Sequence, residues 1–178
     1  MIIRKTTPTD LLVVLAIYAK AREFMSENGN PTQWKDYYPP AEMIENDIAD
    51  RHGYVCENEG EVVAVFYYNI ENDATYEYIE GAWQNDANYG VVHRIAVKQG
   101  SKGIGGVCLN WAFEQCGNLK IDTHEDNIPM RRLLDKLGFV YCGKIRVLEG
   151  TEERIAFQKT REEMKMKSKI QESTTDRL

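Results

Sequence analysis

Three glycines fall within the five residues Lys102–Gly106, KGIGG, shortly after the apolar run Val91–Val97. Glycine lets the backbone approach a ligand closely and adopt a positive φ. A helix that starts at such a loop directs unpaired N–H groups and a partial positive charge towards an anion. The stretch QGSKGIGG is therefore a candidate pyrophosphate site, although a glycine-rich turn can also serve packing alone.

Two common phosphate-binding motifs are absent from the sequence. No segment matches GxxxxGK[ST], and the dinucleotide fingerprint GxGxxG is not found either. That fingerprint normally opens a doubly wound parallel sheet, whereas the glycines of KGIGG come late in the chain. The ligand of this loop has to be inferred from the elements around it.

The spacing of apolar residues predicts the elements that position the loop. Residues 1–7 form a short strand, and TPTD at Thr7–Asp10 combines a capping box with proline at the first helical position, so a helix begins there. Further helices are expected after Pro39-Pro40, over Gly103–Gln115 and at IPMRRLLDKL. Strands are expected at YVCE, EVVAVFYYNI, TYEYIEGAW (Thr75–Trp83), GVVHRIAV, LKIDTH, GFVYCGKIRVL and RIAFQK.

Antiparallel strands thus come first in the chain, and strand–helix–strand units follow. This order predicts an α+β fold with α/β/α layers, in which helices cover both faces of a mixed, mostly antiparallel, twisted sheet. With 178 residues the chain is expected to form a single domain over residues 1–160, followed by a charged C-terminal tail over 161–178.

Composition limits the range of partners and compartments. The net charge of −6 argues against nucleic acid, which binds to basic surfaces. No apolar run is long enough to span a membrane, and the N-terminus lacks the pattern of a signal peptide, so a cytoplasmic location without membrane contact is expected. The four cysteines form no CxxC and no cluster with histidine, so no metal is expected.

The second half of the chain resembles the GNAT superfamily of acyl-CoA-dependent N-acyltransferases. The resemblance spans Val91–Gly143 and rests on HRIAVKQGSKGIGG, an amphipathic helix, IDTHEDN and a helix that ends in LLDKLGF. It includes the GxG at Gly103–Gly105 and the spacing from Asn127 to Gly138-Phe139. It implies the GNAT-like N-acyltransferase fold and acetyl-CoA as co-substrate.

The resemblance also implies which residues bind the cofactor. Backbone groups of Ile95, Ala96 and Val97 would pair with the pantetheine arm, which lies along the strand. Asn127 would contact the arm, and Met130 would border it. Backbone N–H groups would hold the pyrophosphate at Ser101, Lys102, Gly103, Ile104, Gly105 and Gly106.

Two positions depart from the pattern of the family. Gly100 stands where relatives usually carry glutamine or arginine, so backbone donors and Lys102 would have to hold the pyrophosphate. Leu134 stands where many relatives carry a tyrosine that acts as general acid. The usual acid is therefore missing.

In this reading an amine attacks the thioester directly in a ternary complex, and a base must first take the proton of the ammonium. Asp122 and His124 are candidate bases, and Tyr141 is the candidate to replace the missing acid. Each has a structural alternative, because an aspartate can cap a helix and a tyrosine on a strand often serves packing.

His93 is the candidate base on the cofactor strand itself. Strict alternation along that strand would place it on the same face as Ile95 and Val97. The alternative is a hydrogen-bonded histidine of the core.

The acceptor amine is expected at the loops NGNPTQWKDYYPP and TYEYIEGAW. Trp34, Tyr78 and Trp83 would offer apolar walls, while Glu77 and Glu80 would pair with a cation. The alternative is that these aromatic side chains close the core beneath long loops.

The sequence therefore predicts an N-acetyltransferase that moves an acetyl group from acetyl-CoA to a primary amine of a small molecule or peptide, in a fold compatible with a homodimer. Two alternatives stay open. One is an acyl-CoA-binding sensor or regulatory module with weak catalysis, which the leucine at position 134 would suit. The other is an unrelated nucleotide-dependent enzyme whose loop holds a different pyrophosphate.

Overall fold

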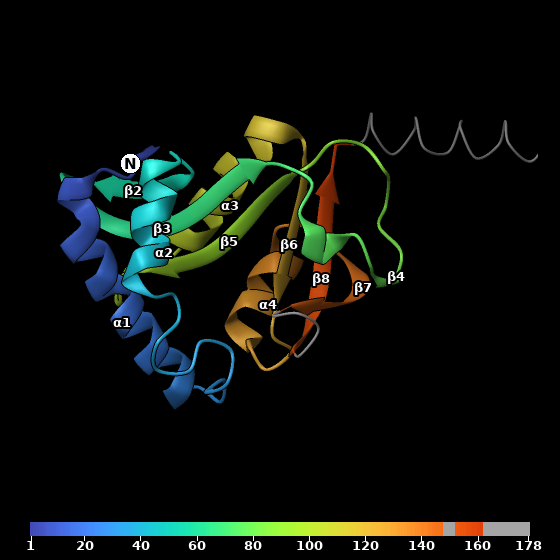
Figure 1. Ribbon diagram of the computed structural model, residues 1–178, viewed down its shortest axis with the longest axis horizontal. Coiled ribbons are helices and arrows are strands. Elements are labelled where there is room, and N and C mark those ends of the chain that lie inside the picture. The colour runs from blue at the N-terminus through green and yellow to red at the C-terminus, as the bar shows by residue number, and fades with distance from the viewer. Residues whose placement is uncertain (148–151, 162–178) are drawn as a thin grey trace, which may run out of the picture.

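The computed structural model describes residues 1–147 and 152–161 (Figure 1). Its strands are β1 (Ile2–Lys5), β2 (Gly53–Asn58), β3 (Glu61–Ile70), β4 (Glu80–Gly81), β5 (Gly90–Val97), β6 (Asn118–Thr123), β7 (Val140–Val147) and β8 (Glu152–Thr160). Its helices are α1 (Leu11–Glu27), α2 (Ala41–Ala49), α3 (Ile104–Cys116) and α4 (Ile128–Lys136), with short 3-10 turns η1 (Pro8–Asp10) and η2 (Ala74–Tyr76). The predicted tail lies outside the described residues, apart from Arg161.

The strands of the described residues join one eight-stranded sheet in the order β1-β2-β3-β5-β6-β8-β7-β4. Its neighbours are antiparallel except for β5 and β6, which are parallel. The apolar sides of α1 and α2 pack on one face of the sheet, and those of α3 and α4 pack on the other. In Figure 1, α2 passes in front of β3 and α3 lies behind it. This confirms the predicted layered α+β fold with a mixed, mostly antiparallel sheet.

The single parallel pair separates after its first residues. Only Gly90 and Val91 of β5 pair with β6, opposite Leu119 and Lys120, and the two strands then diverge (Figure 1). A bulge in β5 coincides with the divergence, because the pairing with β3 shifts by one residue at Arg94, whose φ is +52°. A bulge of this kind bends a strand and increases its twist. The sheet is therefore open at its centre.

One predicted strand is absent. Thr75–Trp83 was expected to be a strand, but it forms η2 and then only the two-residue β4. The side chain of Asp73 accepts the N–H of Thr75 over 2.9 Å, which begins a turn instead of a strand. The indole of Trp83 donates to the carbonyl of Tyr76 over 3.0 Å, which folds the segment back on itself.

Among the described residues, no helix has both the length and the apolar character that a membrane crossing would require.

Candidate active site

A cavity of about 630 Å³ opens where β5 and β6 diverge. One side of it is formed by the second half of β5, the loop that follows, and the start of α4. The other side is formed by α1, the loop after it, the segment around Asp73, and β8. The lining includes Phe24, Gln33, Trp34, Tyr37, Tyr38, Asp73, His93, Arg94, Ile95, Ala96, Val97, Gly100, Ser101, Asp122, Asn127, Met130, Glu152 and Arg154.

The backbone of β5 presents hydrogen-bonding groups to this opening. The N–H of Lys98 donates to the carbonyl of Val63 over 2.8 Å, so these two residues form a hydrogen-bonded pair of the β3–β5 ladder. Because such pairs alternate along antiparallel strands, Ala96 directs its N–H and C=O towards β3 and Val97 directs both away from it. Val97 therefore offers an edge to an added chain, whereas Ala96 can contribute only its side chain.

The glycine loop has the conformation that its sequence requires. Gly103 precedes α3 with a φ of +77°, and Gly100 has a φ of +87°. The first intrahelical donor of α3 is Val107, whose N–H reaches the carbonyl of Gly103, so the N–H groups of Ile104–Gly106 point out of the helix start. These groups and the exposed Lys102 lie beyond the lining of the cavity, at the end marked by Gly100 and Ser101.

Gly105 has a packing role in addition. A Cβ placed there would lie 3.2 Å from the Cδ2 atom of Leu133 and 3.7 Å from Cγ2 of Val97. The small residue therefore lets α3 approach both α4 and β5. This close contact fixes the glycine loop relative to the strand and helix that line the cavity.

Asn127 lines the cavity, but its side chain is engaged within the protein. Its Oδ1 atom accepts the N–H of Met130 over 3.2 Å and so caps α4, and its Nδ2 atom donates to Oε1 of Gln33 over 3.0 Å. Asn127 thus joins α4 to the loop after α1. Leu134, at the position of the missing tyrosine, is fully buried in the core and does not face the cavity.

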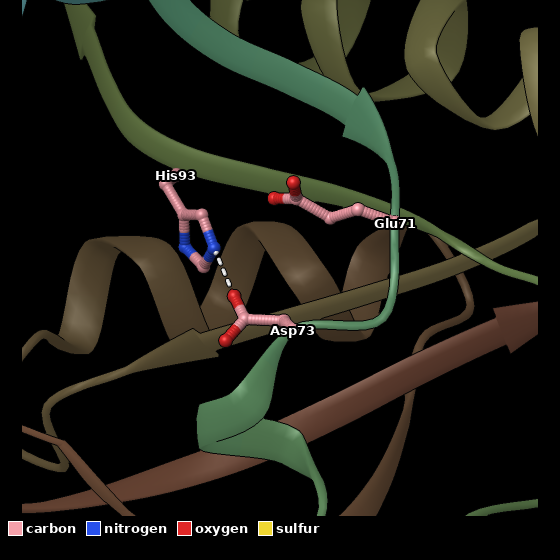
Figure 2. Close-up of side chains that lie close together, drawn as sticks. All are labelled: Glu71, Asp73 and His93. Atoms are coloured by element: carbon pink, nitrogen blue, oxygen red, sulfur yellow. Dashed lines mark hydrogen bonds and ion pairs between the residues drawn. The ribbon is translucent and has the colours of Figure 1, made fainter.

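His93 is at the centre of a hydrogen-bonded network in the cavity wall. Its Nε2 atom lies 2.7 Å from Oδ2 of Asp73, and its Nδ1 atom lies 3.9 Å from Oδ1 of Asp122 (Figure 2 shows the contact with Asp73). The buried hydroxyl of Tyr76 donates to the same Asp122 oxygen over 2.7 Å. Because the Asp73 carboxylate can only accept, the neutral ring carries its hydrogen on Nε2 and presents the lone pair of Nδ1.

The environment fixes the charge of the groups beside His93. Burial raises the pKa of Asp73, but hydrogen bonds from His93 and Thr75 outweigh it and lower this pKa to about 2. Asp73 is therefore ionised at neutral pH. Burial, together with the neighbouring Asp122 carboxylate, raises the pKa of Tyr76 well above its usual value, so the phenol stays protonated and holds Asp122 in place.

The bulge changes the face on which His93 lies. Ile95 and Val97 pack against the core beneath α3 and α4. His93 and Arg94 instead both contact the ring of Tyr67 on the opposite face, with 5.7 Å between the ring centroids of His93 and Tyr67. The expectation that His93 shares a face with Ile95 and Val97 is therefore wrong, because the extra residue of the bulge reverses the alternation.

Two of the proposed catalytic residues lie outside this cavity. His124 lines a separate cavity of about 380 Å³ with Glu152 and Lys35, and its Nδ1 atom lies 3.2 Å from the N–H of Asp126. Tyr141 is 54% exposed and packs edge-on against Phe157. Neither is brought together with His93 and Asp122.

Of the residues predicted to bind the acceptor, Trp34 lines the cavity and the others do not. Glu77, Tyr78 and Glu80 are exposed, and they line neither this cavity nor the one beside His124. Trp83 stacks on the buried Lys120, whose ammonium lies 4.1 Å from the ring centroid. The loss of the predicted strand at Thr75–Trp83 explains this, because Thr75 of η2 still lines the cavity but Glu77, Tyr78, Glu80 and Trp83 after it do not.

Sequence reasoning missed several residues of the cavity. Asp73 carried a local signal, since Asp-Ala-Thr is a typical start of a turn in which the aspartate caps. Gln33, Glu152 and Arg154 carried none, because they come from parts of the chain that only the fold brings together. The buried Arg154 donates to Oε2 of Glu152 over 2.6 Å, so both ends of this pair are held at the cavity.

Comparisons with known proteins agree with this geometry. Residues 16–139 match the family described as "Acetyltransferase (GNAT) family". A search of curated proteins found no significant match. Among solved structures, a GNAT-family acetyltransferase from Streptococcus agalactiae shares 30% identity, with a TM-score of 0.82, 90% of this chain covered and 95% of that one.

Two more distant structures share the fold. The ribosomal-protein-alanine N-acetyltransferase of Brucella melitensis is 23% identical, with a TM-score of 0.61, 90% of this chain covered and 100% of that one. The yncA protein of Salmonella typhimurium, solved with its cofactor acetyl-CoA, is 15% identical, with a TM-score of 0.60 and coverage of 90% and 94%.

Proposed function

Because the chain belongs to the acetyltransferase (GNAT) family, we propose that it moves the acetyl group of acetyl-CoA to a primary amine of a small molecule or peptide. The observation that carries this proposal is the position of His93, in the wall of the cavity formed where β5 leaves β6. The amine attacks the thioester carbonyl directly, with both reactants bound at once.

One side of the cavity suits the cofactor. This cofactor wall consists of Ile95–Val97, Gly100, Ser101 and Met130, together with the glycine loop Lys102–Gly106, which lies just beyond the lining of the cavity. The N–H and C=O of Val97 form hydrogen bonds with the amide groups of the pantetheine arm, as they would with a neighbouring strand. The outward N–H groups at the start of α3 meet the pyrophosphate, and Lys102 adds a positive charge.

The other side suits the acceptor. This acceptor wall consists of Trp34, Asp73, His93, Asp122 and Arg154. Trp34 packs against the rings of Tyr18 and Tyr38, which gives the wall a rigid apolar surface. The polar groups are concentrated where the reacting amine would lie, as in most sites for small ligands.

His93 acts as the general base. Its Nδ1 lone pair takes a proton from the substrate ammonium, and the amine nitrogen then bonds to the thioester carbon as the carbon–sulfur bond breaks. The nitrogen releases its second proton to water as the amide forms, and the imidazolium afterwards returns its proton to solvent. The imidazolium that forms lies between the carboxylates of Asp73 and Asp122, which stabilise its charge. A proton transfer of this kind contributes about 10²–10⁴ to a rate.

The leaving thiol needs no tyrosine at position 134. A thiol with a pKa of about 8.5 departs readily as thiolate and takes a proton from water afterwards. Leu134 is fully buried, so the side chain at this position packs in the core. The absence of the usual acid therefore slows the final step without removing the reaction.

The experiment is a survey of amines, with release of free thiol and the mass of the acetylated product measured together. Amino acids, polyamines, aminoglycosides and peptides with a free N-terminus represent the main classes. We expect at least one class to give equal amounts of thiol and acetylated amine, with initial-rate patterns that intersect. Tight acetyl-CoA binding without turnover of any amine would instead indicate a sensor module.

A further inference from the structure

His93 separates the cavity described above from a second hollow. This second hollow has a volume of about 460 Å³, is open to solvent, and is lined by Asp47, Tyr67, Glu71 and Asp73. His93 lines both hollows. The imidazole can therefore be reached from outside without passing the acetyl-transfer cavity.

Three potential metal ligands converge on this second hollow. The side chains of Glu71, Asp73 and His93 each offer one ligand atom, and these atoms all lie within 4.8 Å of one another. Figure 2 shows the Glu71 carboxylate pointing towards the imidazole of His93, with Asp73 bonded to the same ring. The ligands come from the segment after β3 and from β5, so two strands fix their positions.

We propose that Glu71, Asp73 and His93 bind a divalent transition-metal ion such as Zn²⁺ at this place. One imidazole nitrogen and two carboxylate oxygens are a ligand set that suits Zn²⁺, with bonds of about 2.0–2.2 Å. With such bonds the ligand atoms of a tetrahedral site lie about 3.3–3.6 Å apart. The 2.7 Å between Nε2 of His93 and Oδ2 of Asp73 must therefore widen by roughly half an ångström or more, and ligand atoms that now lie up to 4.8 Å apart must approach by about 1 Å. Water completes the coordination from the open side of the hollow.

Hydrogen bonds from neighbouring side chains orient the carboxylates of Glu71 and Asp73, and this also supports a metal site. The hydroxyl of Tyr67 donates to Oε1 of Glu71, and the side-chain amide of Asn69 donates to Oε2, each over 2.9 Å. Oδ1 of Asp73 is held by Thr75, which leaves Oδ2 to face His93. Metal-binding carboxylates are typically oriented by such second contacts.

The imidazole has an outer partner as well. A histidine that binds a metal through one nitrogen usually donates from the other to a carboxylate. Nδ1 of His93 lies 3.9 Å from Oδ1 of Asp122, and Tyr76 holds that carboxylate in place. A shift of about 1 Å would bring Asp122 within hydrogen-bonding distance of the Nδ1 hydrogen of a metal-bound His93.

The local charge also favours a cation. Nη2 of Arg94, which lines the same hollow, lies 2.8 Å from each of the two carboxylate oxygens of Asp47, so this pair is neutral. The carboxyl groups of Glu71, Asp73 and Asp122 then lie around the imidazole, and among the described residues none of them is paired with a lysine or an arginine. A cation at this place would offset their negative charge.

The ion and the acetyl-transfer reaction exclude each other, a consequence that rests on the proposed function. A metal on Nε2 forces the hydrogen of the neutral ring onto Nδ1, so the lone pair that would take the proton of the amine is no longer available. The hydrogen bond between Nε2 of His93 and Oδ2 of Asp73 is replaced by bonds from both atoms to the ion. Metal binding thus switches off the base without blocking the cofactor.

Binding is tested first, without reference to activity. The full chain is stripped with a chelator and titrated with Zn²⁺ by calorimetry and with Co²⁺ by visible absorption. We expect one ion per chain, absorption typical of nitrogen and oxygen ligands, and an affinity about tenfold or more weaker in Glu71→Gln and in Asp73→Asn. Glu45→Gln, an exposed glutamate on α2, is the matched control and should bind like the native protein.

Two results would overturn the metal site. One is the absence of Zn²⁺ binding in the micromolar range, and the other is binding that the Glu71→Gln and Asp73→Asn changes do not weaken. Strong near-ultraviolet bands with Co²⁺ would have the same effect, because they would place the ion on cysteine thiolates.

Activity is measured second, with the best amine from the survey. We expect the stripped enzyme to be active, Zn²⁺ to inhibit it, and half-inhibition of Glu71→Gln to need about tenfold more Zn²⁺ relative to its own metal-free rate. Zn²⁺ binding by a protein inactive with every amine would refute the proposed function alone. Activity without Zn²⁺ binding would refute the metal site alone, and activation by bound Zn²⁺ would refute the exclusion.

Discussion

The two walls of the cavity are built in different ways. The cofactor wall comes from the part of the chain that runs from β5 through the glycine loop and α3 to α4, and we propose that much of it binds through backbone groups. The acceptor wall collects side chains from five places, namely the loop after α1, the segment after β3, the middle of β5, β6 and β8. A wall that comes from one stretch of the chain can be predicted from a sequence motif. A wall made of side chains that are distant in the sequence can be identified only once the fold is known.

This contrast predicts that damage to each wall should affect a different step. Changes in the cofactor wall should lower the affinity for acetyl-CoA. Changes in the acceptor wall should lower the rate of acetyl transfer and leave that affinity intact.

The largest effect is expected for His93→Gln in the acceptor wall. Loss of the base should lower kcat by about 10²–10⁴, with the Kd of acetyl-CoA unchanged. Steady-state kinetics and calorimetry on the same preparation measure the two quantities. A matching loss of cofactor affinity would show that the walls are not separate.

The next largest effect is expected for Gly103→Val in the cofactor wall. A β-branched residue is strongly disfavoured at a φ of +77°, so the loop must move and its N–H groups must leave the pyrophosphate. Hydrogen bonds to charged groups contribute about 1.5–3 kcal/mol each, so we expect at least about a hundredfold weaker acetyl-CoA binding in calorimetry.

Gly29→Val is the control for backbone strain. Gly29 has a φ of +83° and lies after α1, away from the glycine loop. It should cost stability in thermal unfolding as Gly103→Val does, while acetyl-CoA still binds. Equal losses of affinity in the two variants would mean that strain alone, and not the cradle, explains the result.

A smaller effect is expected for Asp73→Asn. The amide can no longer stabilise the imidazolium, and one hydrogen bond to a charged group is worth about 1.5–3 kcal/mol, so kcat should fall roughly ten- to a hundredfold. Asp50→Asn, an exposed change at the end of α2, serves as the control. An unchanged kcat in Asp73→Asn would remove Asp73 from the mechanism.

The smallest effect is expected for Lys102→Ala. This side chain is exposed, and exposed charge pairs contribute about 0–1 kcal/mol, so acetyl-CoA affinity should fall about fivefold or less. The loss should shrink further in high salt. A drop as large as that of Gly103→Val would show that side-chain charge, and not the backbone, holds the pyrophosphate.

The sequence also predicted the cofactor wall better than the acceptor wall. The apolar periods and the GxG with its downstream Asn127 and Gly138-Phe139 predict the layered fold and the family, because these signals are local or lie close together. Leu134 could be identified as a departure for the same reason. Its burial in the core explains how the chain tolerates it.

The acceptor wall was less accessible because its signals are not local. The bulge at Arg94 reverses the face of His93, and no pattern of apolar residues marks a bulge at a residue other than glycine. The turn that Asp73 starts replaced an expected strand and removed Glu77, Tyr78, Glu80 and Trp83 from the site. Gln33, Glu152 and Arg154 enter the cavity only through the tertiary arrangement.

The most direct test of the account is the structure of a dead-end complex with coenzyme A and the amine that the survey identifies. The account predicts that the amine nitrogen lies within about 2.6–3.2 Å of Nδ1 of His93, directly or through one water, and faces the cofactor sulfur. An amine bound with its nitrogen at His124 or Tyr141, or outside the cavity between β5 and β6, would contradict it.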